Sequence, residues 1–225
     1  MIFNDSIKDG RPIEAVIHLA GLKSVFESVS KPLRYWDVNV FGTYNLLSVM
    51  SNYACYSIVF SSSATIYGLT DYVPILEDQK PSPINPYGTT KLAIENMLHD
   101  LFKSDKRLWS ICSLRYFNPV GAHPSGQIGE DPIGVPNNLF PYITQVAAGR
   151  RNVLKVYGDN WDTLDGSGIR DYIHIMDLAE GHFAAMKYLE SNEPEIVYFN
   201  LGTGKGTSVL ELLKIFEKVN YCKIP

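Results

Sequence analysis

The stretch Ser57-Ile-Val-Phe60 is a short apolar run that lies between two segments with helical spacing. Similar runs occur at Ala15-Val-Ile-His-Leu19 and Ser110-Ile-Cys-Ser-Leu114. Apolar runs without polar alternation are typical of strands that are buried on both faces of a parallel sheet. The segments between them, residues 33–53 and 86–104, fit helices. Strands that alternate with helices in this way predict a doubly wound α/β sheet.

The pattern changes after Tyr116. Residues 117–138 are rich in Gly, Pro, Asn and His and predict a long loop. Loops of that length in a compact domain are usually functional. A final helix is expected to begin after Ser208, which forms a capping-box pattern with Glu211. Between these segments we expect a helix at about 139–148, a strand near Leu154–Tyr157, a polar loop at 158–169 and a helix at 176–190.

The composition excludes several classes of protein. The net charge is -4 and the 20 basic residues are scattered, so no nucleic acid partner is expected. No apolar run is long enough to cross a membrane, and residues 1–10 lack the apolar core of a signal peptide. The three cysteines, Cys55, Cys112 and Cys222, have no metal-binding spacing and predict reduced thiols in a cytoplasmic protein. We expect no metal, and we interpret His18 and His174 as core histidines.

Two features have the order and spacing of a redox site. Phe60–Gly68 contains three serines and directly follows an apolar strand, and Tyr87-Gly-Thr-Thr-Lys91 opens a predicted helix. Tyr87 and Lys91 are four residues apart and therefore share one helical face. An ammonium beside a phenol is expected to lower a pKa that is normally about 10. Tyr87 could then accept a proton from a hydroxyl group near neutral pH.

Each of these features alone also has an ordinary structural explanation. A buried tyrosine beside a lysine with an extended stem is common in helices. Serine clusters such as Ser61-Ser62-Ser63 mark many turns. Their combination, on a strand end and on the next helix, favours catalysis over either explanation.

Several longer motifs resemble the UDP-galactose 4-epimerase family of extended short-chain dehydrogenases/reductases. They are Val16-Ile-His-Leu-Ala-Gly-Leu-Lys23, Phe60–Gly68, Asn85-Pro-Tyr-Gly88, Leu114–Gly126, Gly129-Glu-Asp-Pro132, Pro136-Asn-Asn-Leu139 and Arg170-Asp-Tyr-Ile-His174. The resemblance implies an incomplete Rossmann-like doubly wound parallel sheet with a smaller nucleotide-sugar-binding α/β domain. Residues 1–117 would be a partial NAD-binding domain. Residues 118–225 would mostly form the substrate domain, with elements near 170–200 returning to the NAD-binding sheet.

The resemblance also implies roles for individual residues. Tyr87 would be the catalytic base, Lys91 its partner and a contact to the nicotinamide ribose, and Ser63 the third catalytic member. The other residues implied to bind NAD are Ala20, Gly21, Lys23, Asn39 and Phe117. The residues implied to bind the UDP-sugar are Asn118, Asn138, Leu139, Val156, Tyr157 and Arg170.

Most of these residues have a structural alternative. Gly21 could simply end a strand, Asn39 could bond its own helix backbone, and Phe117 could belong to the core. Arg170 beside Asp171 could form a surface ion pair that contributes little.

The implied reaction is the reversible inversion of UDP-glucose and UDP-galactose at C4, through a 4-keto intermediate and with NAD as cofactor. Ala64 and Thr65 follow Ser63, where related dehydratases and decarboxylases tend to place a carboxylate. The resemblance therefore favours epimerisation, although N-acetylhexosamine and pentose substrates stay open. A UDP-hexose partner and, for the complete protein, a homodimer through residues 33–53 and 86–104 are expected by analogy.

The sequence contains no Gly-x-x-Gly-x-x-Gly fingerprint for the dinucleotide pyrophosphate. By resemblance, we expect the first strand–helix units to precede Met1 and further UDP contacts to follow Pro225. Without those units, the strand at Ala15–Leu19 is expected to lie at a sheet edge. Two hypotheses therefore stand: an active UDP-hexose 4-epimerase, and a catalytically silent fragment with partial UDP-sugar contacts.

Overall fold

The computed structural model describes residues 2–70 and 72–225, which form two compact units. The first unit contains the chain up to Tyr116 together with Ala179–Leu201. The second contains Phe117–Leu178 and Gly202–Pro225. The chain therefore enters the second unit, returns to the first and ends in the second.

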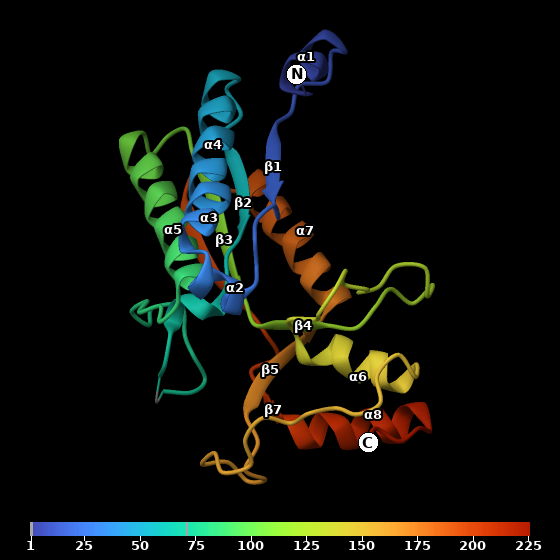
Figure 1. Ribbon diagram of the computed structural model, residues 1–225. Helices are drawn as coiled ribbons and strands as arrows, with labels where there is room; N and C mark the ends of the chain where they lie inside the picture. The colour runs from blue at the N-terminus through green and yellow to red at the C-terminus, as the bar shows by residue number, and fades with distance from the viewer. Residues whose placement is uncertain (1, 71) are drawn as a thin grey trace. The chain divides into compact units, whose positions relative to one another are not determined.

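A four-stranded parallel sheet forms the centre of the first unit (Figure 1). Its strand order is β1-β2-β3-β6, so β1 is paired on one side only. The three predicted strands are confirmed, and the register pairs Val16 with Ile58 and Ile58 with Ile111. The strands are β1 (Ala15–His18), β2 (Ser57–Ser61), β3 (Ser110–Tyr116) and β6 (Ile196–Leu201).

Alternate side chains of these strands enter two separate apolar cores. Ile58, Phe60 and Ile111 pack with residues of helices α4 (Gly42–Asn52) and α5 (Pro86–Ser104). Val59, Cys112 and Leu114 point to the other face and pack against Ala185 and Leu189 of helix α7 (Ile175–Ser191). Because side chains alternate along a strand, apolar residues at consecutive positions require cover on both faces. The runs read from the sequence therefore reflect a sheet with helices on both sides, as Figure 1 shows for this unit.

The helix before β2 is less regular than predicted. The expected helix at 33–53 consists of three consecutive segments, of which the middle one is a π-helix. The predicted helix at 86–104 is confirmed. Asn85 caps its start by accepting a hydrogen bond from Gly88 N, and Pro86 occupies its first turn. The helical elements of this unit are α1 (Ile2–Lys8), α2 (Val25–Ser30), α3 (Pro32–Tyr35), η1 (Trp36–Phe41), α4 (Gly42–Asn52), η2 (Ala64–Tyr67), α5 (Pro86–Ser104) and most of α7 (Ile175–Ser191).

The second unit contains a three-stranded sheet in the order β4-β5-β7. Strand β4 (Asn118–Val120) is parallel to β5 (Ile169–His174), and β7 (Gly206–Ser208) is antiparallel to β5. Its helices are α6 (Leu139–Ala147) and α8 (Val209–Asn220). The predicted cap is confirmed, since the Ser208 hydroxyl accepts a hydrogen bond from Glu211 N at 3.0 Å.

Two sequence predictions in the second unit are wrong. The strand expected near Leu154–Tyr157 is absent, and that segment is irregular. A strand needs a partner ladder, and among the described residues the only backbone bond recorded for this segment joins Leu154 N to the carbonyl of Pro225. His174 is exposed rather than buried in a core, and its Nδ1 accepts a hydrogen bond from Met176 N.

In the described part of the chain, no helix has both the length and the apolar character to span a bilayer.

His18 is the core histidine that the sequence predicted. It is 8% exposed, and its Nε2 lies 2.8 Å from the hydroxyl of Thr43. Burial, together with the charge of Lys91, lowers the pKa of His18 to about 4. The imidazole is therefore neutral in the folded protein at neutral pH.

This lowered pKa predicts a loss of stability in mild acid. Below about pH 6.5 the unfolded chain binds a proton that the folded chain does not bind until about pH 4. The stability contribution is complete above pH 6.5 and is lost as the pH falls toward 4, by about 2 kcal/mol after screening is allowed for. Urea denaturation at pH 7, 5.5 and 4.5 measures the effect. A His18→Gln variant with the same pH dependence as the parent would contradict it.

Candidate functional site

The carboxyl end of β2 and the start of α5 bring the predicted catalytic residues together. Ser63 lies two residues after the last residue of β2 and caps η2, with its hydroxyl accepting from Thr65 N at 3.2 Å. Tyr87 and Lys91 lie on the first two turns of α5. Their side chains are 6% and 5% exposed, so both polar groups are held in a largely apolar interior.

Lys91 has a defined position in this site. Its Nζ donates to the carbonyl oxygen of Ser61 at 2.7 Å and lies 4.8 Å from the centre of the Phe60 ring. The centre of the Tyr87 ring is 5.9 Å away. Burial lowers the pKa of Lys91 to about 8, against the opposing effect of Glu95. Lys91 is therefore a buried cation whose charge depends on its immediate partners.

The expectation of a lowered pKa for Tyr87 is wrong. Desolvation by burial raises the pKa of Tyr87 well above its ordinary value, and nearby Tyr116 adds to the rise. A hydrogen bond with Ser63 acts in the opposite direction. The sequence indicated the right neighbour in Lys91, but the ammonium bonds the Ser61 carbonyl, so desolvation dominates at the phenol.

The loop after β1 lies against the same part of α5. Asn39, in the π-helix, is 2% exposed and holds the backbone of Leu22 by two hydrogen bonds. Its Oδ1 accepts from Leu22 N at 2.7 Å, and its Nδ2 donates to Leu22 O at 3.0 Å. A third bond, from Nδ2 to Thr90 Oγ1 at 3.3 Å, ties this loop to α5. Asn39 therefore does not bond its own helix, which was the structural alternative.

Gly21 allows this loop to approach Lys91 closely. A Cβ atom on Gly21 would lie 3.1 Å from Asn39 Oδ1 and 3.9 Å from Lys91 Nζ. The adjacent residues Ala20 and Lys23 are exposed on the same loop. The structure thus gathers Gly21, Asn39 and Lys91 at one place.

Asp171 organises the predicted substrate residues of the second unit that lie near β5. Its carboxylate accepts from Thr203 N, Thr203 Oγ1 and Gly204 N at 2.7–2.9 Å. Its carbonyl accepts from Asn118 Nδ2 at 3.0 Å. A Cβ on Gly202 would lie 2.8 Å from the Phe117 ring and 2.6 Å from the Asp171 carboxylate. Glycine at this position lets Phe117 and Asp171 pack over the turn.

The remaining predicted substrate residues are more open. Arg170 is exposed, and its Nη1 donates to the carbonyl of its neighbour Ile169 at 2.7 Å. Asn138 precedes α6 without a side-chain cap bond, and Leu139 begins that helix half-buried. Val156 and Tyr157 are exposed in the irregular segment, at 40% and 85%.

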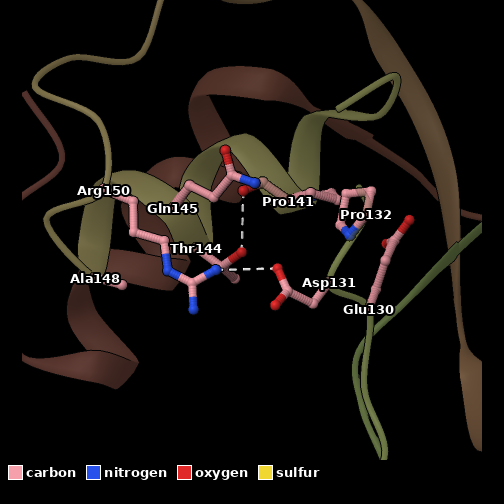
Figure 2. Close-up of a pocket in the computed structure, with 8 residues that line it drawn as sticks. All are labelled: Glu130, Asp131, Pro132, Pro141, Thr144, Gln145, Ala148 and Arg150. Carbon is pink, nitrogen blue, oxygen red and sulfur yellow. Dashed lines mark hydrogen bonds and ion pairs between the residues drawn. The ribbon is translucent and has the colours of Figure 1, made fainter. Parts of the chain in front are cut away.

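A shallow cavity of about 260 Å³ lies beside α6 in the second unit. Figure 2 shows Glu130, Asp131 and Pro132 on one side and residues of α6 and Arg150 on the other. Asp131 and Arg150 form an exposed ion pair at 3.0 Å across it. None of the residues predicted to contact substrate lines this cavity, so it is separate from the site above.

A buried ion pair between α5 and β3 was not predicted from the sequence. Arg115 Nη2 lies 2.7 Å from Glu95 Oε2, and the side chains are 6% and 3% exposed. Two signals were present in the sequence. Glu95 follows Tyr87 and Lys91 at the same four-residue spacing, and Arg115 is a charge inside an apolar strand. Within residues 2–70 and 72–225, no group of three metal-ligating side chains occurs.

Comparison with known proteins gives a consistent picture. A family model described as "NAD dependent epimerase/dehydratase family" matches residues 3–202. UDP-glucose 4-epimerase 1 of Oryza sativa subsp. japonica is 56% identical over 98% of this chain and 63% of its own length. A bifunctional UDP-glucose 4-epimerase and UDP-xylose 4-epimerase 3 of Arabidopsis thaliana is 55% identical over 94% of this chain and 60% of its own. The chain therefore spans about three fifths of the length of these curated relatives.

A solved structure has the same fold. The UDP-glucose 4-epimerase of Bifidobacterium longum, in complex with NAD+ and UDP, superposes with a TM-score of 0.91. It is 48% identical, and the match covers 99% of this chain and 66% of that one.

The contacts of Asn39 predict a specific cost for the change Asn39→Asp. The carboxylate would still accept from Leu22 N, but an oxygen would replace the Nδ2 donor and face the Leu22 carbonyl and Thr90. Loss of a buried donor should lower the free energy of unfolding by about 1–3 kcal/mol. Urea denaturation measures this. The matched control is Asn45→Asp, which adds the same charge at an exposed position of α4 and should stay within about 0.5 kcal/mol of the parent. Equal effects of the two changes would contradict the role of Asn39.

Proposed function

The chain belongs to the NAD dependent epimerase/dehydratase family, and we propose that it carries the catalytic residues of a UDP-hexose 4-epimerase. The observation that carries this proposal is the buried arrangement of Ser63, Tyr87 and Lys91 at the end of β2. A phenol that hydrogen-bonds a serine and shares its helix face with a buried ammonium is suited to exchange a proton with a sugar hydroxyl. The relatives that support this substrate class are named as UDP-glucose 4-epimerases.

The proton-transfer group in this proposal is Tyr87 Oη. Its raised pKa means that the phenol holds its proton at rest, and the hydrogen bond from Ser63 stabilises the phenolate when the proton leaves. Lys91 remains mostly charged below about pH 8 and adds a positive charge near the same ring. Ser63 would therefore offset part of the desolvation that burial imposes on Tyr87.

The residues around Lys91 fit the nicotinamide cofactor that the family uses. Gly21 keeps the loop over Lys91 free of a side chain, and Asn39 fixes that loop by its bonds to Leu22. Ala20, Gly21, Lys23, Asn39 and Lys91 would hold NAD, with Phe117 beside it. When bound, NAD supplies the hydride acceptor that allows the sugar C4 to be oxidised and reduced again.

The second unit would hold the nucleotide part of the substrate. Arg170 is exposed, and a guanidinium is the side chain best matched to a diphosphate. Asn118, Asn138, Leu139, Val156 and Tyr157 complete the proposed UDP-sugar contacts. UDP-pentoses are a further substrate class to test, since one relative is named as bifunctional with UDP-xylose.

We propose a cytoplasmic role in galactose metabolism for the complete protein, because the proposed reaction interconverts UDP-galactose and UDP-glucose. We also propose that two copies pair through the helical segments at 33–53 and 86–104. Exposed apolar side chains on the first segment support this, among them Val38, Phe41 and Tyr44.

A second candidate function is nucleotide-sugar binding without turnover. The observation that favours it is that the proposed UDP-sugar contacts belong to the second unit, whereas Ser63, Tyr87 and Lys91 belong to the first.

The first experiment tests turnover of the purified chain. We expect the chain, with saturating NAD and UDP-galactose, to form UDP-glucose, which a coupled dehydrogenase detects. The change Tyr87→Phe removes the proton-transfer group and should lower the rate by about 10²–10⁴. Folded protein that does not turn over at any NAD concentration would favour the second candidate. UDP-N-acetylglucosamine and UDP-xylose assayed in parallel define the sugar specificity.

A second experiment tests nucleotide binding without requiring turnover. We expect UDP to bind the chain in calorimetric titrations and Arg170→Ala to weaken binding by roughly tenfold or more, because a charge-assisted hydrogen bond is lost. The matched control is Arg150→Ala, which removes another exposed arginine of the same unit from an exposed ion pair. If both variants bind UDP as the parent does, Arg170 is not a diphosphate ligand.

A further inference from the structure

The ion pair of Glu95 and Arg115 has more partners than a simple bridge between a helix and a strand. The guanidinium bonds both carboxylate oxygens, through Nε at 3.1 Å and Nη2 at 2.7 Å. The hydroxyl of Ser62 donates to Glu95 Oε1 at 2.5 Å. Ser62 is fully buried, and it is the residue directly before Ser63. Glu95 thus holds both β3 and the segment that carries the proposed catalytic serine.

Glu95 is also in line with the other groups on α5. Tyr87, Lys91 and Glu95 are spaced by four residues and are all buried on the face toward the sheet. Lys91 bonds the carbonyl of Ser61, and Glu95 bonds the side chain of Ser62. Two successive turns of α5 are therefore hydrogen-bonded to Ser61, the last residue of β2, and to Ser62, which directly follows it.

Arg115 extends this contact to further elements of the first unit. Its Nη1 donates to the hydroxyl of Tyr67 at 3.0 Å and to the carbonyl of Glu77 at 2.9 Å. Its guanidinium carbon lies 4.6 Å from the centre of the Tyr198 ring. The arginine therefore connects β3 with η2, β6 and the segment that leads to α5. Each of these partners would lose a bond or a ring contact if Arg115 moved.

A buried ion pair is a poor source of stability, because desolvation of two charges offsets most of their attraction. An apolar pair of the same volume would hold the helix on the sheet equally well. The hydrogen bonds with Ser62, Tyr67 and Glu77 fix the orientation of the bonded groups, which apolar contacts do not. The arrangement therefore indicates that the ion pair positions its neighbours rather than stabilises the fold.

We propose that Glu95, held by Arg115, is a positioning residue that keeps the Ser61–Ser63 segment in register with Tyr87 and Lys91. This inference rests on the proposed function, since the residues it positions are the proposed catalytic group. Glu95 touches no reacting atom; it acts through Ser62 and Lys91.

The charges around Lys91 agree with this role. Glu95 raises the pKa of Lys91 against the larger lowering effect of burial. The other titratable groups that face Lys91 are His18 of β1, which is neutral, and Tyr87, which holds its proton. Arg115 carries a like charge but is paired with Glu95. Glu95 is therefore the anion that favours the charged form of Lys91.

The test replaces the pair by apolar side chains of similar volume, Glu95→Leu with Arg115→Met, so that no single charge is left buried. Lys91 is followed by its 13Cε resonance during a pH titration and is identified by its loss in Lys91→Arg. We expect the double variant to fold and the midpoint of Lys91 to fall by about one pH unit from its value near 8. In chains that turn over UDP-galactose, kcat should fall about tenfold or more while KM changes little. An unchanged midpoint in the folded double variant overturns the proposal.

If the double variant does not fold, Ser62→Ala decides, because it removes one hydroxyl and no charge. Its matched control is Ser113→Ala, a fully buried serine on β3 whose hydroxyl has no hydrogen-bond partner among the described residues. We expect the Lys91 13Cε resonance to shift and its midpoint to move in Ser62→Ala but not in Ser113→Ala. Equal behaviour of the two overturns the proposal. The titration requires no turnover, so loss of the proposed epimerase activity and failure of this inference are separate results.

Discussion

The structure of the first unit depends on how it accommodates one buried positive charge. The ammonium of Lys91 is almost fully removed from water, and an isolated charge in such a place is costly. The Ser61 carbonyl supplies a direct hydrogen bond, and Glu95 supplies a negative charge that favours the ammonium. Because the carbonyl belongs to the last residue of β2, neutralising the charge also fixes the helix against the end of the strand. Electrostatic stabilisation and the geometry of the site therefore come from the same contacts.

Burial shifts the pKa of Tyr87 in the direction opposite to that of Lys91. Removal from water disfavours the charged form of each group. For Tyr87 the charged form is the phenolate, so the pKa of Tyr87 rises. Only the Ser63 bond opposes that rise. A tyrosine in this state holds its proton until further positive charge or a better hydrogen bond approaches. Because a phenol that holds its proton cannot accept another, Tyr87 can act as a base only where its pKa is lowered.

The sequence predicted the elements whose determinants are local. The helix at 86–104 was found because Asn85 and Pro86 define its start, and the strands were found because both of their faces are apolar. Properties that depend on a partner distant in sequence could not be predicted. A strand near Leu154–Tyr157 would need a partner strand to form a ladder. The direction of the pKa shift of Tyr87 depends on which acceptor the Lys91 ammonium donates to. Arg115 in an apolar strand signalled a buried partner, but Glu95 could be identified only from the structure.

In both units, an amide or carboxylate side chain hydrogen-bonds the backbone of a loop. Asn39 binds the backbone of Leu22, Asp171 binds that of Thr203 and Gly204, and Asn200 donates from Nδ2 to the carbonyl of Ile75. Loops at strand ends have no ladder partner, so their backbone groups need side chains to satisfy them. An amide or carboxylate can do this from a neighbouring element without adding a strand. The exposed side of such a loop is then not needed for these bonds, and exposed loops are where proteins commonly place binding residues.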